Sequence, residues 1–118
     1  MIAVDVVGAA EAIVDRLRAQ GMRANVDPAK LTPPCAWVSV TGVDHAYLGG
    51  CGVATVTVWL ITTDRPPAIA HKALGELLGQ ALAVIDPTEQ TATNEAITLT
   101  QSSQPLPAYR MTTTTEIR

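Results

Sequence analysis

The sequence predicts an α+β domain in which two helices pack on one side of a largely antiparallel sheet, in the order α-β-β-β-α-β-β. Two stretches place apolar residues at helical spacing, and five others alternate apolar with polar residues. The 118 residues are 47% hydrophobic, which suffices for one core. We therefore expect residues 1–118 to form a single domain.

The first helix is predicted over residues 5–21, DVVGAAEAIVDRLRAQG. Asp5 stands where a side chain caps a helix, and Gly21 stands where a helix commonly ends. One apolar stripe follows the helical spacing and consists of Val6, Val7, Ala10, Ile13, Val14 and Leu17. This stripe is the surface that we expect to pack on the sheet.

Three strands and two connections are predicted next. Residues 22–26 alternate and predict a short strand, whereas three prolines within 28–34 predict an extended surface connector. Residues 35–43 predict a second strand, with valines on one face and Trp37 on the other. The glycine-rich residues 44–52 predict a hairpin loop before a third strand at 53–63. Trp59 lies on the mixed face of that strand, so the second face of the sheet is expected to be more apolar than a solvated surface.

The second helix is predicted to begin at a cap formed by Asp64 and to end at Asp86–Pro87. Its apolar face comprises Ala70, Leu74, Leu77, Leu78, Ala81, Leu82 and Ile85. Residues 88–95 are polar and predict a loop, and the alternation of AITLTQS from residue 96 predicts the next strand.

The stretch YRMTTTTEI resembles a polar tail but alternates like a strand. Threonine is β-branched and favours a pleated strand. Apolar residues bracket the threonines at period two, and a disordered segment has no reason to keep that spacing. We therefore predict a strand over residues 108–117.

The charge distribution argues against tight nucleic-acid binding. The net charge is −3, and the eight basic residues are scattered along the sequence. Contact with DNA that merely passes by remains compatible with this pattern. The first residues lack a basic n-region, and no apolar run approaches the ~20 residues of a membrane span. We expect a cytosolic chain with reduced thiols and no membrane contact.

The chain offers few groups for catalysis or metal binding. The possible nucleophiles and bases are Cys35, Cys51, His45 and His71, and their spacing matches no zinc motif. We expect a buried Cys35, an exposed Cys51 and a solvated His71. The sequence therefore predicts no catalytic residue, no metal and no cofactor.

Glycines at two places in the sequence could serve a function. The stretch GGCG at 49–52 precedes a strand and lacks the lysine of a phosphate-binding loop, so a hairpin tip is predicted. Gly75 and Gly79 lie one turn apart on the second helix. They are either tolerated there or allow close approach of another chain, since each costs about 1 kcal/mol relative to Ala.

Taken together, four segments resemble the tail terminator proteins of long-tailed bacteriophages, particularly small tail proteins of phages that infect actinobacteria. The segments are LTPPCAWVSV, ATVTVWLITTD, ALGELLGQALAVI and YRMTTTTEI. The resemblance covers most of the chain and lies in the order of its elements and in their pattern of apolar and polar residues. It implies an α+β domain of which six copies form a ring.

The resemblance implies a structural role in the virion and no enzymatic activity. The ring would cap the tail tube, stop its growth and join it to the head connector, after assembly in the host cytoplasm. Its partners would be further copies of itself, the major tail tube protein and the connector or stopper protein, with DNA only as passing cargo. Exposed sheet edges and the apolar second face would then form subunit or tube contacts.

The hairpin loop is the predicted partner-binding segment, through Asp44, His45, Tyr47 and Leu48. The alternative for Tyr47 and Leu48 is that they fold back onto the core. Two other functions remain open: another phage neck, connector or minor tail protein, and a small α+β enzyme or ligand-binding domain. An enzyme needs convergent polar groups in a cleft, of which the sequence supplies few.

Overall fold

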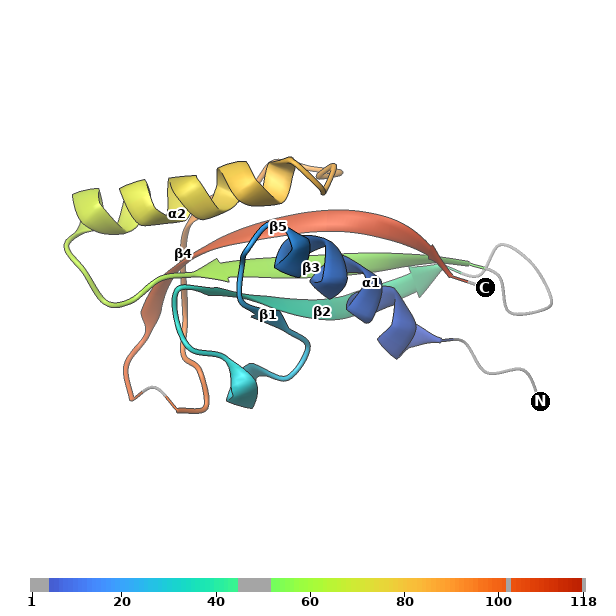
Figure 1. The fold of residues 1–118 in the computed structure, drawn as a ribbon, viewed down its shortest axis with the longest axis horizontal. Coiled ribbons are helices and arrows are strands. Elements are labelled where there is room, and N and C mark those ends of the chain that lie inside the picture. The colour runs from blue at the N-terminus through green and yellow to red at the C-terminus, as the bar shows by residue number, and fades with distance from the viewer. Residues whose placement is uncertain (1–4, 45–51, 102, 118) are drawn as a thin grey trace.

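The computed structural model describes residues 5–44, 52–101 and 103–117, with only the main chain of Ile117 (Figure 1). Its elements are α1 (Val6–Ala19), β1 (Ala24–Asn25), a 3-10 turn (Pro28–Lys30), β2 (Cys35–Asp44), β3 (Gly52–Ile61), α2 (Pro67–Leu82), β4 (Ala92–Ile97) and β5 (Leu106–Ile117). The predicted α+β class and element order are confirmed. The molecule is elongated, with extents of 49 × 26 × 24 Å.

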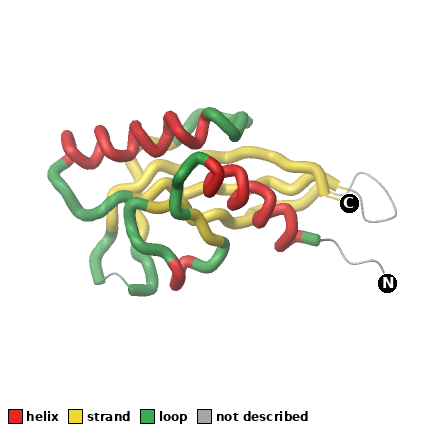
Figure 2. Tube along the Cα trace, viewed as in Figure 1, coloured by secondary structure: helices red, strands yellow, loops and turns green. Residues whose placement is uncertain are grey.

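The five strands form one sheet in the order β1-β2-β3-β5-β4. All neighbours are antiparallel except β1 and β2, which are parallel. The three central strands are much longer than the outer two and run the length of the molecule (Figure 2). The threonine-rich segment belongs to β5, which pairs with β3 from Gly52↔Ile117 to Ile61↔Ala108. The predicted strand over residues 108–117 is therefore confirmed and begins two residues earlier.

Helix α1 begins and ends as its sequence predicts. The Asp5 carboxylate accepts a hydrogen bond from the Gly8 N–H at 2.9 Å, which satisfies one of the free donors of the first turn. Gly21 adopts φ +83°, a left-handed conformation that other residues rarely take, and so ends the helix. The stripe residues Ile13, Val14 and Leu17 are buried.

Helix α2 begins later than predicted, and the proposed cap by Asp64 is wrong. The N-cap is Pro66, and no side chain caps the helix. Because a residue that precedes proline is held in an extended conformation, Pro66 (ψ 146°) cannot join the helix that Pro67 begins. The helix ends at Leu82, and Ile85 is buried just beyond it.

Two strands differ from their predicted bounds. The first is reduced to Ala24–Asn25. Strand β4 spans Ala92–Ile97, so part of the predicted loop 88–95 is strand, and Leu99 lies beyond the strand end. The outer position of β4 explains the error, because the strand packs on the core through few of its residues and therefore lacks the apolar alternation of a buried strand.

Both helices cover the same face of the sheet and enclose the main core (Figure 1). The alternating residues of β3 on this face are fully buried: Ala54, Val56, Val58 and Leu60. Strand β5 contributes Tyr109 and Met111, and Val38 comes from β2. The alternation predicted for these strands is therefore confirmed.

A second, smaller cluster lies on the opposite face at one end of the sheet. Its buried members are Leu31, Cys35, Ile61, Leu99 and Ala108. Leu31 and Leu99 come from the connections before β2 and after β4, so the chain's own loops cover this part of the face. The chain's own connections thus cover much of the apolar part of the second face, whereas Trp37 and Trp59 are only partly buried.

Candidate functional site

The sheet has two open edges, and both lie at the end of the molecule where α1 begins. Strand β1 pairs with β2 only as far as Trp37, and β4 pairs with β5 only as far as Arg110. In the described part of the chain, no strand pairs with the outer side of residues 38–44 or 113–117. The end of the sheet consists of three strands, β2, β3 and β5, with β2 and β5 outermost.

The main-chain direction on each edge follows from hydrogen bonds at its closed end. The Ala36 N–H donates to the Arg23 oxygen at 2.7 Å. The main-chain N–H and C=O groups of the even-numbered residues of β2 therefore point away from β3, as far as the bulge after Val40. On β5, the Thr112 oxygen accepts from the Thr88 N–H at 2.9 Å. Because main-chain groups alternate along a strand, those of Val38 and Val40 face one open edge. The groups of the even-numbered residues beyond Thr112 face the other.

These edges carry few of the features that keep sheet edges from pairing. Proteins usually protect an open edge with charged residues, proline, short strands, bulges or a covering loop. Neither VSVTGVD at 38–44 nor TTTEI at 113–117 contains lysine or proline, although each carries one carboxylate, Asp44 or Glu116, and β2 has a bulge after Val40. On β5 the open stretch begins after Thr112, whose main-chain oxygen already accepts from the Thr88 N–H. The two open stretches are therefore candidate sites of strand addition.

A shallow apolar groove runs beside the open edge of β2. It is lined by Val6, Val7, Ala10, Val26, Trp37, Val38, Ser39 and Val40. Val7 is 64% exposed and Val6 is 38% exposed, although both belong to the apolar stripe of α1. Val6 and Val7 line the same groove as Val38 and Val40, so the side chains of a strand added at this edge would lie near them.

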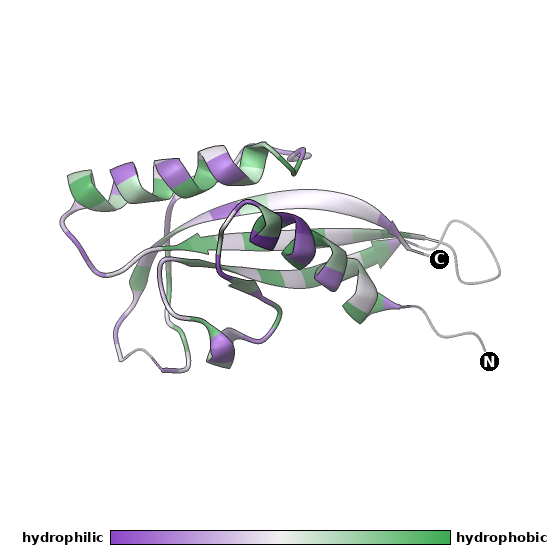
Figure 3. Cartoon of the chain, in the orientation of Figure 1, coloured by the Kyte–Doolittle hydropathy of each residue, from purple (hydrophilic) through white to green (hydrophobic). Residues whose placement is uncertain are grey.

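The open part of the second face carries hydroxyl groups. Thr55 and Thr57 of β3 lie between Thr41 on one side and Thr112 and Thr114 on the other. Figure 3 shows β5 as a pale ribbon of intermediate hydropathy over much of its length. The Thr41 and Thr57 hydroxyl oxygens lie 3.2 Å apart. This part of the face is therefore polar.

A row of large side chains separates the hydroxyl surface from the second apolar cluster. Trp37 is opposite Trp59, and Trp59 is opposite Arg110. The Arg110 guanidinium carbon lies 5.8 Å from the Trp59 ring centroid, and its Nη2 lies 3.4 Å from Glu95 Oε1. The Trp37 indole N–H donates to the Val26 oxygen at 3.1 Å. The row is thus held by intramolecular contacts.

Of the four residues predicted to bind a partner, the structure places one. Asp44 is exposed at the end of β2, beside the open edge. His45, Tyr47 and Leu48 lie outside the described residues, and so does Cys51. The contact predicted for this loop remains a prediction.

His71 is exposed, as predicted, but it has a partner that the sequence does not indicate. Its Nδ1 lies 2.6 Å from the Tyr109 hydroxyl, which joins α2 to β5. The two residues stand 38 positions apart, so no local pattern reports the contact. Tyr109 itself is 7% exposed and belongs to the main core.

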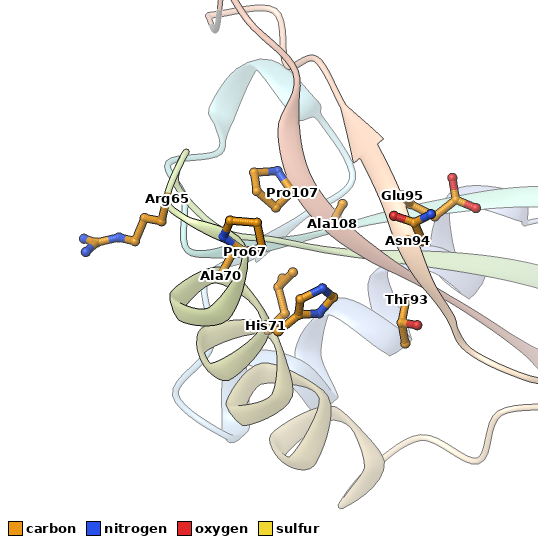
Figure 4. A pocket seen from close by; sticks show the side chains of 10 residues that line it. Arg65, Pro67, Ala70, His71, Thr93, Asn94, Glu95, Pro107 and Ala108 are labelled. Atoms are coloured by element: carbon orange, nitrogen blue, oxygen red, sulfur yellow. The ribbon is translucent and has the colours of Figure 1, made fainter.

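A cavity of about 140 Å³ opens beside His71 (Figure 4). It lies between the first turns of α2 and strands β4 and β5, and the His71 ring faces it while the Arg65 side chain points away. Ligand sites usually measure about 300–1,000 Å³. The cavity is therefore too small to enclose a molecule of metabolite size, and the His71–Tyr109 pair is best explained as a link between elements.

Cys35 is buried, as predicted. Burial raises the pKa of its thiol to about 11, and Arg23 lowers it in part. The thiol is thus protonated and a poor nucleophile at neutral pH. In the ranges that the structure describes, no three His, Cys, Asp or Glu residues lie close enough to hold a metal ion.

Gly75 and Gly79 face open space, because no atom lies within 4 Å of the Cβ that either would carry. The helices described by the structure include none long and apolar enough to cross a membrane. No protein-family model and no curated protein sequence matches the chain.

Proposed function

We propose that this chain is the subunit of a ring that caps a phage tail tube, stops its growth and joins it to the head connector. The proposal unites two lines of support. The order and pattern of the elements resemble tail terminators, and among the described residues no strand pairs with the outer sides of β2 and β5 at one end of the sheet. The second observation carries the proposal.

Two different edges on one subunit are suited to ring formation. When one edge of a subunit binds a different edge of the next subunit, each added copy leaves a free edge for another copy. Addition stops only when the last copy binds the first and the ring closes. A ring so formed has a fixed diameter and a central opening. A tube cap requires both, since DNA must pass through the opening.

The proposed function is tested on growing tubes. A major tail protein from a long-tailed phage of the same host is polymerised with and without the purified chain, and tube lengths are measured by electron microscopy. We expect shorter tubes with a ring at one end when the chain is present. Tubes of unchanged length, without a ring, would contradict the proposal.

A further inference from the structure

We infer that copies of this chain join by strand addition, with the open edge of β2 in one copy paired to the open edge of β5 in the next. The inference rests on the proposed ring and specifies the surfaces that build it. It makes the three-stranded ends of neighbouring subunits into one continuous sheet. The predicted loop contact is not required for it.

The two edges are open over the same rows of the sheet. Val40 is opposite Val56 of β3, and Val56 is opposite Thr113 of β5. The row of Asp44 likewise continues through Val53 to Glu116. A second copy placed beside the first in the plane of the sheet therefore brings β5 next to β2 without a large shift along the strands.

The groove beside β2 accommodates the side chains of such a strand. A strand added at this edge keeps the two-residue alternation, so one set of its side chains points to the face that the helices cover. On β5 this set includes Thr115, which is partly exposed and small enough to lie against the exposed Val6 and Val7 of α1. Thr113 is buried in its own copy, where its hydroxyl donates to the Asp86 oxygen at 2.8 Å. The alternate set, with Thr114, extends the hydroxyl surface of the second face.

Charge indicates a small stagger between the copies. Pairing within the same row would place Asp44 beside Glu116, and like charges on neighbouring strands are unfavourable. A shift of two residues separates the carboxylates and keeps every side chain on its original face, whereas a shift of one would invert the faces. Inclined, staggered strands are also the geometry by which a sheet closes on itself.

The buried area indicates that a single contact is weak. At most five paired residues span about 17 Å, and edges about 10 Å thick bury on the order of 300–700 Å² in total. A lasting two-body complex usually buries at least about 1,000 Å². We therefore expect few free dimers, and oligomers that become stable when the ring closes and every copy uses both edges.

Cross-linking tests the pairing directly. In a Cys35→Ala, Cys51→Ser background, Thr41→Cys marks β2 and Thr114→Cys marks β5, and both positions are exposed. A bismaleimide that spans about 10 Å tolerates a shift of two residues, at about 3.4 Å each. We expect a covalent dimer when the two variants are mixed, none from either alone, and a ladder of products from the double variant. Thr41→Cys mixed with Thr93→Cys, on β4, is the matched control and should not cross-link.

An edge proline supplies a second test that preserves the fold. The Thr114 N–H points away from β3, so Thr114→Pro removes a donor that only another copy would use. We expect loss of the ladder and at least a tenfold weaker assembly, with a melting temperature close to that of the parent. Thr98→Pro, at an exposed position outside the strands, should assemble normally.

The outcomes separate this inference from the proposed function. Cross-linking of a single variant with itself would indicate a two-fold contact and overturn the inference. Rings that form without the β2–β5 cross-link would overturn it and leave the proposed function standing. A chain that stays monomeric at high concentration and on tube ends would overturn both.

Discussion

The hydrogen bond between His71 and Tyr109 is the clearest side-chain link between α2 and the sheet. At 2.6 Å it joins an exposed ring to a largely buried phenol. We predict that Tyr109→Phe lowers the free energy of unfolding by about 0.5–1.5 kcal/mol, the usual net contribution of one such bond. Urea unfolding measures this loss.

A double-mutant cycle with His71→Ala supplies the control for that prediction. If the bond accounts for the loss, the second substitution adds little once Tyr109 has become Phe. Losses that simply add would show that the two side chains act independently.

Cys35 gives the molecule a pH-dependent stability at high pH. Burial raises its pKa from 9.0 to about 11, so the folded state holds a proton that the unfolded state loses first. Below pH 9 the contribution is complete, and stability should fall as pH rises from 9 towards 11. Comparing Cys51→Ser with the Cys35→Ala, Cys51→Ser double variant isolates this component, which should vanish in the double variant.

The same double variant tests the absence of a chemical role for the thiols. We predict that it assembles and caps tubes like the parent, apart from a modest loss of stability from the space left at position 35. A double variant that folds normally but fails in assembly would contradict this prediction.

Strand β5 is an interior strand of the sheet and part of the main core. It lies between β3 and β4 and contributes Met111 and Tyr109 to the main core. Truncation after Pro107 should leave the chain unfolded, because it removes these side chains and exposes the main-chain groups of β3. Circular dichroism and thermal melting measure the effect, and a melting temperature within a degree or two of the full chain would contradict it.

A point substitution tests the same strand more gently. Met111 is fully buried, so Met111→Ala should cost about 2–5 kcal/mol. Thr114→Ala, at an exposed position of the same strand, should change stability by less than about 0.5 kcal/mol. Equal effects at both positions would show that the alternation of β5 is misassigned.

The partner contact predicted for the loop between β2 and β3 stays a prediction. Replacing Tyr47 and Leu48 by Ser should weaken assembly without lowering the melting temperature. Assembly equal to that of the parent would show that these side chains are not part of a contact.

The elements that the sequence predicts well are those whose alternation is enforced by burial. Strands β3 and β5 pack on the main core through every second residue, so their patterns follow the pleat. Strand β4 lies at the sheet edge, where solvent tolerates any polar residue, and its predicted bounds were displaced. The α2 cap was misplaced because Asp64 is a good capping residue, but two prolines fix the helix start further along.

The candidate site was less predictable because it depends on strand order. The sequence indicates that strands exist, but not that β5 inserts between β3 and β4, nor that β1 and β4 stop short of the far end of the sheet. Coverage of the second face by the connections with Leu31 and Leu99 is likewise a long-range contact that no local pattern reports. The sequence pattern alone therefore indicates apolar residues on that face without indicating the connections that cover part of them.

For the whole molecule, the account predicts assembly that depends on concentration. Analytical ultracentrifugation should detect mainly the 12.4 kDa chain when dilute and a species of six times that mass when the protein is concentrated. Small oligomers should be scarce, since closure stabilises the ring. A population dominated by dimers at every concentration would contradict this assembly scheme.

Electron cryomicroscopy of tailed particles assembled with this chain shows whether it forms a ring at the head end of the tail tube. We expect a closed ring of the chain between the last ring of tube subunits and the connector, with β2 of each copy beside β5 of the next. Particles whose neck lacks the chain, or that contain it elsewhere than at the tube end, would show that the chain is not a tube cap.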